Sequence, residues 1–112
     1  MAEYNVSIKT FDGQSMPNVT PTSVLGKPYD TIKFSSLHSG SQPPSEIYVV
    51  ITSGMVGAPP SGSPFVQEFV LPPNSSHSVV ISKDNKTAQI TYSVSLVSPI
   101  GIDTPRPIVE DD

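Results

Sequence analysis

Residues 77–97 place the strongest constraint on what this chain can fold into. Two runs in which apolar and polar residues alternate, HSVVISK and KTAQITYSVSLV, flank the pair Asp84 and Asn85. Successive side chains of a strand point to opposite faces, so this alternation indicates two strands that each bury one face. A two-residue turn at the central pair would set both apolar sets on one face. We therefore predict a β-hairpin in which Val79 lies opposite Ile90.

A hairpin with one apolar face needs a second layer to cover it, so the rest of the chain must supply more strands. Stretches with the alternation or the apolar content of strands are residues 3–11, 29–37, 46–53 and 65–71, with a weaker candidate at 23–25. The unbroken apolar and aromatic run within 46–53 predicts a central strand that is covered on both faces. Residues 54–64, rich in Gly and Pro, are predicted to form a connection that crosses between two sheets.

These strands and the turn residues between them predict an all-β fold, a two-sheet antiparallel β-sandwich. An immunoglobulin-like sandwich is the first choice, and a jelly roll or a small barrel is the second. With 112 residues the chain is long enough for one domain with a real core. We assign residues 1–97 to the sandwich and residues 98–112 to an extended acidic C-terminal tail or edge strand. There is no cysteine, so neither a disulfide framework nor a thiolate metal site can form.

Charge and hydropathy bear on the partners of the chain. The net charge is -4 and only six Lys and Arg are present, which argues against binding to a phosphate backbone. No apolar run approaches the roughly 18 residues of a membrane span, and the first residues lack the pattern of a signal peptide. All four asparagines nevertheless begin an Asn-x-Ser/Thr triplet, the acceptor pattern for glycosylation. A mature secreted fragment therefore stays open, and the compartment is left undecided.

Catalytic and metal-binding groupings are not evident in the sequence. Neither His38 nor His77 belongs to a motif that ties it to a nucleophile, and His77 is expected to pack beside Tyr92 in the hairpin. Four aspartates fall in turns or at strand starts, where hydrogen bonding to the backbone explains them: Asp12, Asp30, Asp84 and Asp103. The sequence also lacks the spacing of a calcium-binding loop. We predict no enzymatic activity, no metal and no cofactor.

The C-terminal tail, SPIGIDTPRPIVEDD, combines acidic residues with apolar ones. It could be a last edge strand, an unstructured terminus, or an arm that adds itself to the sheet of a neighbour. For the arm, the predicted partner-contact residues are Ile100, Ile102, Arg106, Ile108 and Val109.

Two functions from different classes are compatible with these features. The first is a non-enzymatic binding or assembly module that acts through loops, sheet edges and the C-terminal tail, with a protein partner or a second copy. The alternative is a carbohydrate-binding lectin, whose sugar-contact residues would be Tyr29, Asp30 and Asn74 in loops. The hydroxyl-rich polar face of residues 77–97 is a weaker lectin candidate, because no aromatic residue for sugar stacking falls on it.

Overall fold

The computed structural model describes residues 2–13 and 16–97, and in that part of the chain it contains ten strands and no helix. The strands are β1 (Glu3–Phe11), β2 (Asn18–Thr20), β3 (Ser23–Leu25), β4 (Thr31–Ser39), β5 (Glu46–Ser53), β6 (Val56–Gly57), β7 (Phe65–Val66), β8 (Glu68–Leu71), β9 (Ser76–Ile81) and β10 (Gln89–Val97). Nothing in these residues is a helix of the length and apolarity that a membrane crossing requires.

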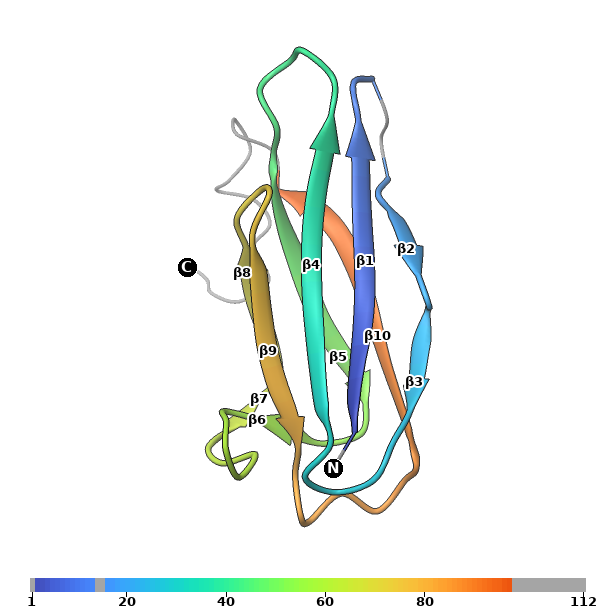
Figure 1. Cartoon of the computed structure of the whole chain (residues 1–112), viewed down its shortest axis with the longest axis vertical. Coiled ribbons are helices and arrows are strands. Elements are labelled where there is room, and N and C mark those ends of the chain that lie inside the picture. Colours follow the sequence, from blue (N-terminus) through green and yellow to red (C-terminus); the bar gives the residue numbers. More distant parts are fainter. Residues whose placement is uncertain (1, 14–15, 98–112) are drawn as a thin grey trace.

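The strands form two facing sheets, as Figure 1 shows. One sheet has the order β2-β1-β4-β9-β6-β7, and the other has the order β3-β10-β5-β8. The predicted all-β sandwich is therefore confirmed. Pairing is antiparallel with one exception, because β1 and β4 run parallel along their whole length, from Glu3 opposite Thr31 to Phe11 opposite Ser39. A parallel pair needs a crossover, and the segment with β2 and β3 supplies it.

The predicted hairpin is wrong, because β9 and β10 lie in opposite sheets. Strand β9 pairs with β4 and β6, while β10 pairs with β3 and β5. Val79 and Ile90 are both fully buried, but they reach the same core from two sides of the sandwich. The segment between the strands crosses from one sheet to the other and is held by two hydrogen bonds. Asn85 Oδ1 accepts one from the backbone N–H of Met55, and Ser82 Oγ accepts one from the backbone N–H of Asp84. The ring of His77 lies against Phe69, not beside Tyr92.

Two of the passages between the sheets set the pairing of the central strands. The chain passes from one sheet to the other between β4 and β5, and again between β9 and β10. As a result β4 pairs with β9 in one sheet and β5 pairs with β10 in the other. Strands B, E, C and F of an immunoglobulin-like sandwich are distributed between two sheets in the same way. The parallel β1–β4 pair is not part of that arrangement.

Three further strand predictions need correction. Strand β5 has the predicted bounds, but its residues alternate between buried and partly exposed, so the described residues bury only one of its faces. The stretch 65–71 is two strands, because β7 pairs with β6 and β8 pairs with β5 in the other sheet. The connection 54–64 does cross between sheets, but the crossing is made at Gly54 and Met55, before the short strand β6, and residues 58–64 then join β6 to β7 within one sheet.

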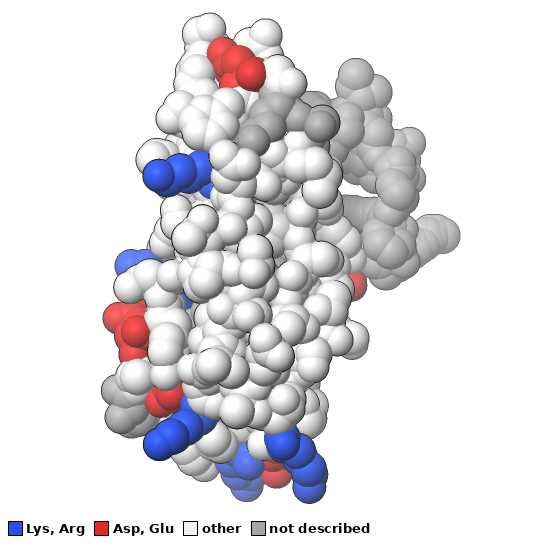
Figure 2. All heavy atoms as spheres, turned by 90° about the vertical axis from the view of Figure 1, so that its right-hand side faces the viewer, with Lys and Arg blue, Asp and Glu red and all other residues white. Residues whose placement is uncertain are grey.

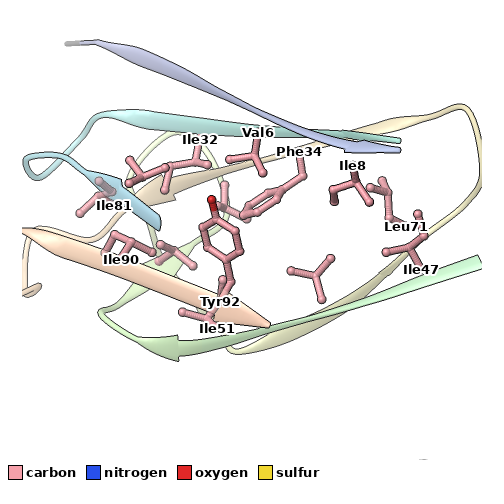
Figure 3. Close-up of a cluster of buried hydrophobic side chains, with 14 residues drawn as sticks. Val6, Ile8, Ile32, Phe34, Ile47, Ile51, Leu71, Ile81, Ile90 and Tyr92 are labelled. Carbon is pink, nitrogen blue, oxygen red and sulfur yellow. The ribbon is translucent and has the colours of Figure 1, made fainter. Parts of the chain in front are cut away.

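The core is filled by side chains from both sheets that meet between the layers, as Figure 3 shows. Phe34 lies at the centre, with edge-to-face contacts to Phe69 at 5.4 Å and to Tyr92 at 5.1 Å between ring centroids. The hydroxyl of Tyr92 donates a hydrogen bond to the carbonyl oxygen of Pro21. Burial raises the pKa of Tyr92 to about 12. The ring is thus a neutral hydrogen-bond donor that ties β10 to the segment between β2 and β3.

Candidate functional site

In the part of the chain that the structure describes, most of strand β10 is paired on one side only. Strand β5 pairs with it from Thr91 to Val97, but on the other side β3 pairs only with its first three residues, Gln89 to Thr91. In Figure 1 β3 meets the lower part of β10 and ends there. Residues 92–97 therefore have no strand partner on that side within the part of the chain that the structure describes. We call this stretch the open edge of β10.

The backbone of the open edge presents hydrogen-bonding groups outward. The N–H of Gly26 donates to the carbonyl oxygen of Ala88 at 2.9 Å, so Ala88 turns its backbone groups toward the side of β3. Backbone groups of an antiparallel strand turn to the same side at every second residue. Tyr92, Val94 and Leu96 therefore turn their N–H and C=O groups to the open side. An extended peptide lying along β10 would find a row of donors and acceptors there.

The apolar layer beneath the open edge is incompletely covered. Ile90, next to β3, is fully buried, whereas the core-facing Val94 and Leu96 are only partly buried. Figure 2 shows the side of the molecule that bears the edges of β2 and β3, where charged side chains lie near the ends and along one margin. Much of the surface between them is uncharged.

A second cluster lies at the end of the sandwich where β1 and β4 finish. Thr10 and His38 face each other across the parallel β1–β4 pair, and Thr10 Oγ1 lies 2.7 Å from His38 Nδ1. The other ring nitrogen, Nε2, lies 3.2 Å from Asp12 Oδ1. These residues line a pocket of about 110 Å³ together with Leu96 of β10. A hydroxyl, an imidazole and a carboxylate in this order resemble the arrangement of a catalytic triad, which the sequence analysis did not predict.

The contacts around this cluster favour a structural role. We call Thr10, Asp12 and His38, with the backbone of Ser41 and Gln42, the clasp. The hydroxyl-bearing Thr10 is only 5% exposed, which leaves it little access to a substrate. The backbone N–H groups of Ser41 and Gln42, which could have stabilised an oxyanion, both donate to the carboxylate of Asp12, at 2.8 Å and 3.1 Å. Asp12 therefore joins the turn after β1 to the loop after β4, and His38 completes the link.

The clasp predicts a loss of stability in acid. The hydrogen bond from the Ser41 N–H, followed by that from Gln42, lowers the pKa of Asp12 below its ordinary value. A carboxyl group with a lowered folded-state pKa stabilises the fold above its unfolded pKa, and this contribution is lost as the pH falls. We expect the urea midpoint to fall between about pH 5 and pH 2, and to fall less in Asp12→Asn. Asp84→Asn, at an exposed turn, is the control; identical pH profiles for all three proteins would contradict the clasp.

The three predicted sugar-contact residues do not form one site. Tyr29 and Asp30 precede β4, whereas Asn74 lies near its far end, where its Oδ1 accepts a hydrogen bond from the N–H of His38 at 2.9 Å. At about 3.3 Å per residue, the length of β4 separates them by roughly 25 Å. Tyr29 is 42% exposed and available for contact.

Asp30 is committed to the fold. It is only 6% exposed, and its carboxylate accepts hydrogen bonds from the N–H groups of Ala2 and Lys27, both at 2.9 Å. The bond from Ala2, followed by that from Lys27, lowers the pKa of Asp30. A sugar at this end would therefore have to use Tyr29 without the help of this carboxylate.

The outer face of the smaller sheet holds an aromatic residue that the sequence analysis did not place there. Tyr48 of β5 lies opposite Ser95 of β10 on one side and Val70 of β8 on the other. Its hydroxyl donates to Glu68 Oε1 at 2.8 Å. The alternation of β5 could have shown that Tyr48 points away from Ile47 and Val49, but only the pairing of β5 with β10 puts it beside the serines.

The predicted partner-contact residues, Ile100, Ile102, Arg106, Ile108 and Val109, lie outside the residues that the structure describes. Within 2–13 and 16–97, no three His, Asp or Glu side chains come together as a set that could hold a metal ion. Comparison of the chain with protein-family models, with curated proteins and with solved structures finds no match. A functional assignment must therefore be based on the residues of this chain.

Proposed function

We propose that this chain is a non-enzymatic binding and assembly module that works by strand addition, in which an extended segment pairs with the open edge of β10. The observation that supports the proposal is the short reach of β3, which covers Gln89 to Thr91 and leaves the next six residues of β10 without a strand on that side in the described structure. The C-terminal segment, with Ile100, Ile102, Arg106, Ile108 and Val109, is the segment that we expect to be added.

The chemistry of the open edge suits this mode of binding. In strand addition, main-chain hydrogen bonds supply affinity and alternate side chains supply specificity. The edge offers the backbone groups of Tyr92, Val94 and Leu96, and the partly buried side chains of Val94 and Leu96 offer an apolar surface below. An exposed strand edge also invites unwanted pairing between copies, so a defined partner has a protective effect.

The geometry of the clasp favours a binding role for this chain over a catalytic one. Its hydroxyl group is buried, and the neighbouring N–H groups of Ser41 and Gln42 are engaged by Asp12. A triad without access to substrate and without oxyanion donors contributes little to acyl transfer.

Peptide binding tests the proposal. A chain cut after Ser98 should bind a fluorescent peptide of residues 99–112 in an anisotropy titration, because its edge is then vacant. Val94→Pro removes an N–H from the centre of the open edge and should weaken binding about tenfold, equal to 1.4 kcal/mol. Val94→Ala is the matched control, since it shortens the same side chain but keeps the N–H. No binding by the cut chain, or equal weakening in both variants, would refute strand addition at this edge.

A carbohydrate-binding role is the second candidate, supported by the position of Tyr48. An aromatic ring beside hydroxyl groups is a common platform for sugars, and here Tyr48 lies opposite Ser95 with Glu68 bonded to its hydroxyl. A glycan array with the full chain, in the presence and absence of calcium, should give binding that Tyr48→Ala abolishes and Tyr29→Ala does not. An array without binding at high protein concentration would remove this candidate.

A further inference from the structure

We infer that the chain is N-glycosylated at Asn5 and Asn18, with both glycans on the outer face of the six-stranded sheet. The proposed function leaves one pattern of the sequence unexplained. All four asparagines begin an Asn-x-Ser/Thr triplet, and proline is never the middle residue. Ser and Thr make up about a quarter of the chain, so chance alone would give about one such triplet among four asparagines. The structure divides the four asparagines into two pairs with different surroundings.

Asn74 and Asn85 hold turns of the fold with their side chains. Asn74 has a φ of +55°, in the left-handed region that asparagine tolerates, and its Oδ1 accepts the hydrogen bond from the N–H of His38. The amide of Asn85 is partly buried and engaged at both ends, since Oδ1 accepts from the N–H of Met55 and Nδ2 donates to the carbonyl oxygen of Thr87. The fold therefore accounts for asparagine at these two positions without a modification. A sugar on Nδ2 of Asn85 would disturb the segment that joins the two sheets.

Asn5 and Asn18 lie on neighbouring strands with their side chains on the same outer face. Along β1, Asn5 alternates with Tyr4 and Val6, which pack in the core. Asn18 of β2 lies opposite Lys9, which is four residues after Asn5 and therefore on the same face of β1. Both asparagines are exposed. Four residues of strand and one strand spacing separate them by roughly 14 Å, which is far enough apart for a glycan on each.

The chemistry of N-glycosylation needs an accessible side-chain nitrogen. Nδ2 of asparagine forms a bond to the anomeric carbon of a sugar that is carried on a polyisoprenyl diphosphate. The bond from this carbon to the phosphate oxygen breaks, the lipid diphosphate leaves, and Nδ2 loses one proton. Asn5 offers such a nitrogen, because its side chain has no hydrogen-bond or ion-pair partner within residues 2–13 and 16–97. The hydroxyl residues of the two triplets, Ser7 and Thr20, lie opposite each other on the same face as the asparagines.

The same face bears large apolar side chains that a glycan would shield. Leu37 of β4 is exposed and lies opposite Lys9, in one row with Asn18. Phe11, also exposed, is two residues beyond Lys9 on β1. A bulky, hydrated glycan on Asn18 would hinder contact between these side chains and other molecules. In Figure 1 this face, with β1, β4 and β9, turns toward the viewer and β10 lies behind it, so the glycans belong to the sheet that does not contain the open edge.

Mass spectrometry of the full chain isolated from its own cells tests the inference. An amidase that releases the glycans in water labelled with heavy oxygen converts each glycosylated asparagine into a labelled aspartate, and fragment spectra then locate the label. We expect the label at Asn5 and Asn18 and not at Asn85, because a chain modified there would lose the contact with Met55 and fold poorly. A chain with the mass of the bare sequence, a missing label at either position, or a label at Asn85 overturns the inference.

Variants of the hydroxyl residues provide a second measurement in which neither asparagine is changed. The full chain is secreted by a eukaryotic cell behind a cleavable leader, and its gel mobility is compared before and after amidase treatment. Ser7→Ala destroys the first triplet and should remove one glycan, whereas Ser7→Thr keeps the triplet and should keep the glycan. Thr20→Ala and Thr20→Ser are the corresponding pair for Asn18. Equal mobility of the untreated proteins within either pair would show that the triplet is not used, and the inference would fail.

Discussion

Replacing Phe34 with alanine is expected to lower the free energy of unfolding by about 3–5 kcal/mol. Phe34 is fully buried and touches an aromatic ring of the other sheet on two sides, Phe69 of β8 and Tyr92 of β10. Truncation removes both edge-to-face contacts and leaves a cavity between the sheets, which the surrounding strands can fill only in part. Because small domains are stable by only about 5–15 kcal/mol, the variant should be close to unfolding at physiological temperature.

Urea denaturation followed by tyrosine fluorescence measures the effect. The matched control is Phe65→Ala, the same truncation at a ring that is 55% exposed in β7, and we expect it to change stability by no more than about 0.5 kcal/mol. Similar losses in the two variants would mean that Phe34 does not hold the two sheets together as its contacts indicate.

The sequence predicted the positions of strands correctly where one face of the strand is buried and the other is exposed to solvent. The bounds of β1 and β5 agree with the alternation and with the turn residues that flank each run. Even the short β3, predicted weakly, is present. Burial of alternate side chains is a local property, because it depends only on which face of the strand meets the core.

The sequence did not predict which strands pair with each other, and residues 77–97 illustrate why. Alternation reports the face of a strand that is buried, but it does not report which strand lies beside it. In a sandwich, two consecutive strands can bury their apolar faces against each other across the core as well as side by side in one sheet. The segment 82–88 decides between these arrangements, and its decisive contact, from Asn85 to the backbone of Met55, joins positions far apart in the sequence.

The candidate sites depend on the same long-range pairing. Thr10 meets His38 only because β1 and β4 pair in parallel with these residues in register. The open edge exists because β3 is short and meets only one end of β10. Neither fact has a local signature, since a parallel pairing and the reach of a neighbouring strand are set by the whole topology. For the C-terminal segment the sequence left three alternatives open, an edge strand, an unstructured terminus and a contact arm, and it identified no surface that an arm would contact.

A second large effect is expected at a glycine where two backbone segments approach closely. Gly57 is buried in β6, between Val80 of β9 and Phe65 of β7. A Cβ atom at this position would lie 2.1 Å from the carbonyl oxygen of Gly62 and 2.4 Å from that of Pro64. Both atoms belong to the backbone and cannot move aside as a flexible side chain would. Gly57→Ala should therefore destabilise the fold by about 3 kcal/mol, the upper part of the range for overpacking.

Gly13→Ala separates this steric effect from the general effect of removing a glycine. Gly13 has a φ of +78° in the turn after β1, and a Cβ there would meet nothing within 4 Å. Alanine at this position should cost about 1 kcal/mol, which is the strain of a left-handed residue without any clash. Thermal unfolding of both variants measures the difference. If Gly57→Ala cost no more than Gly13→Ala, the close approach of Gly57 to the backbone of Gly62 and Pro64 would not limit what this position accepts.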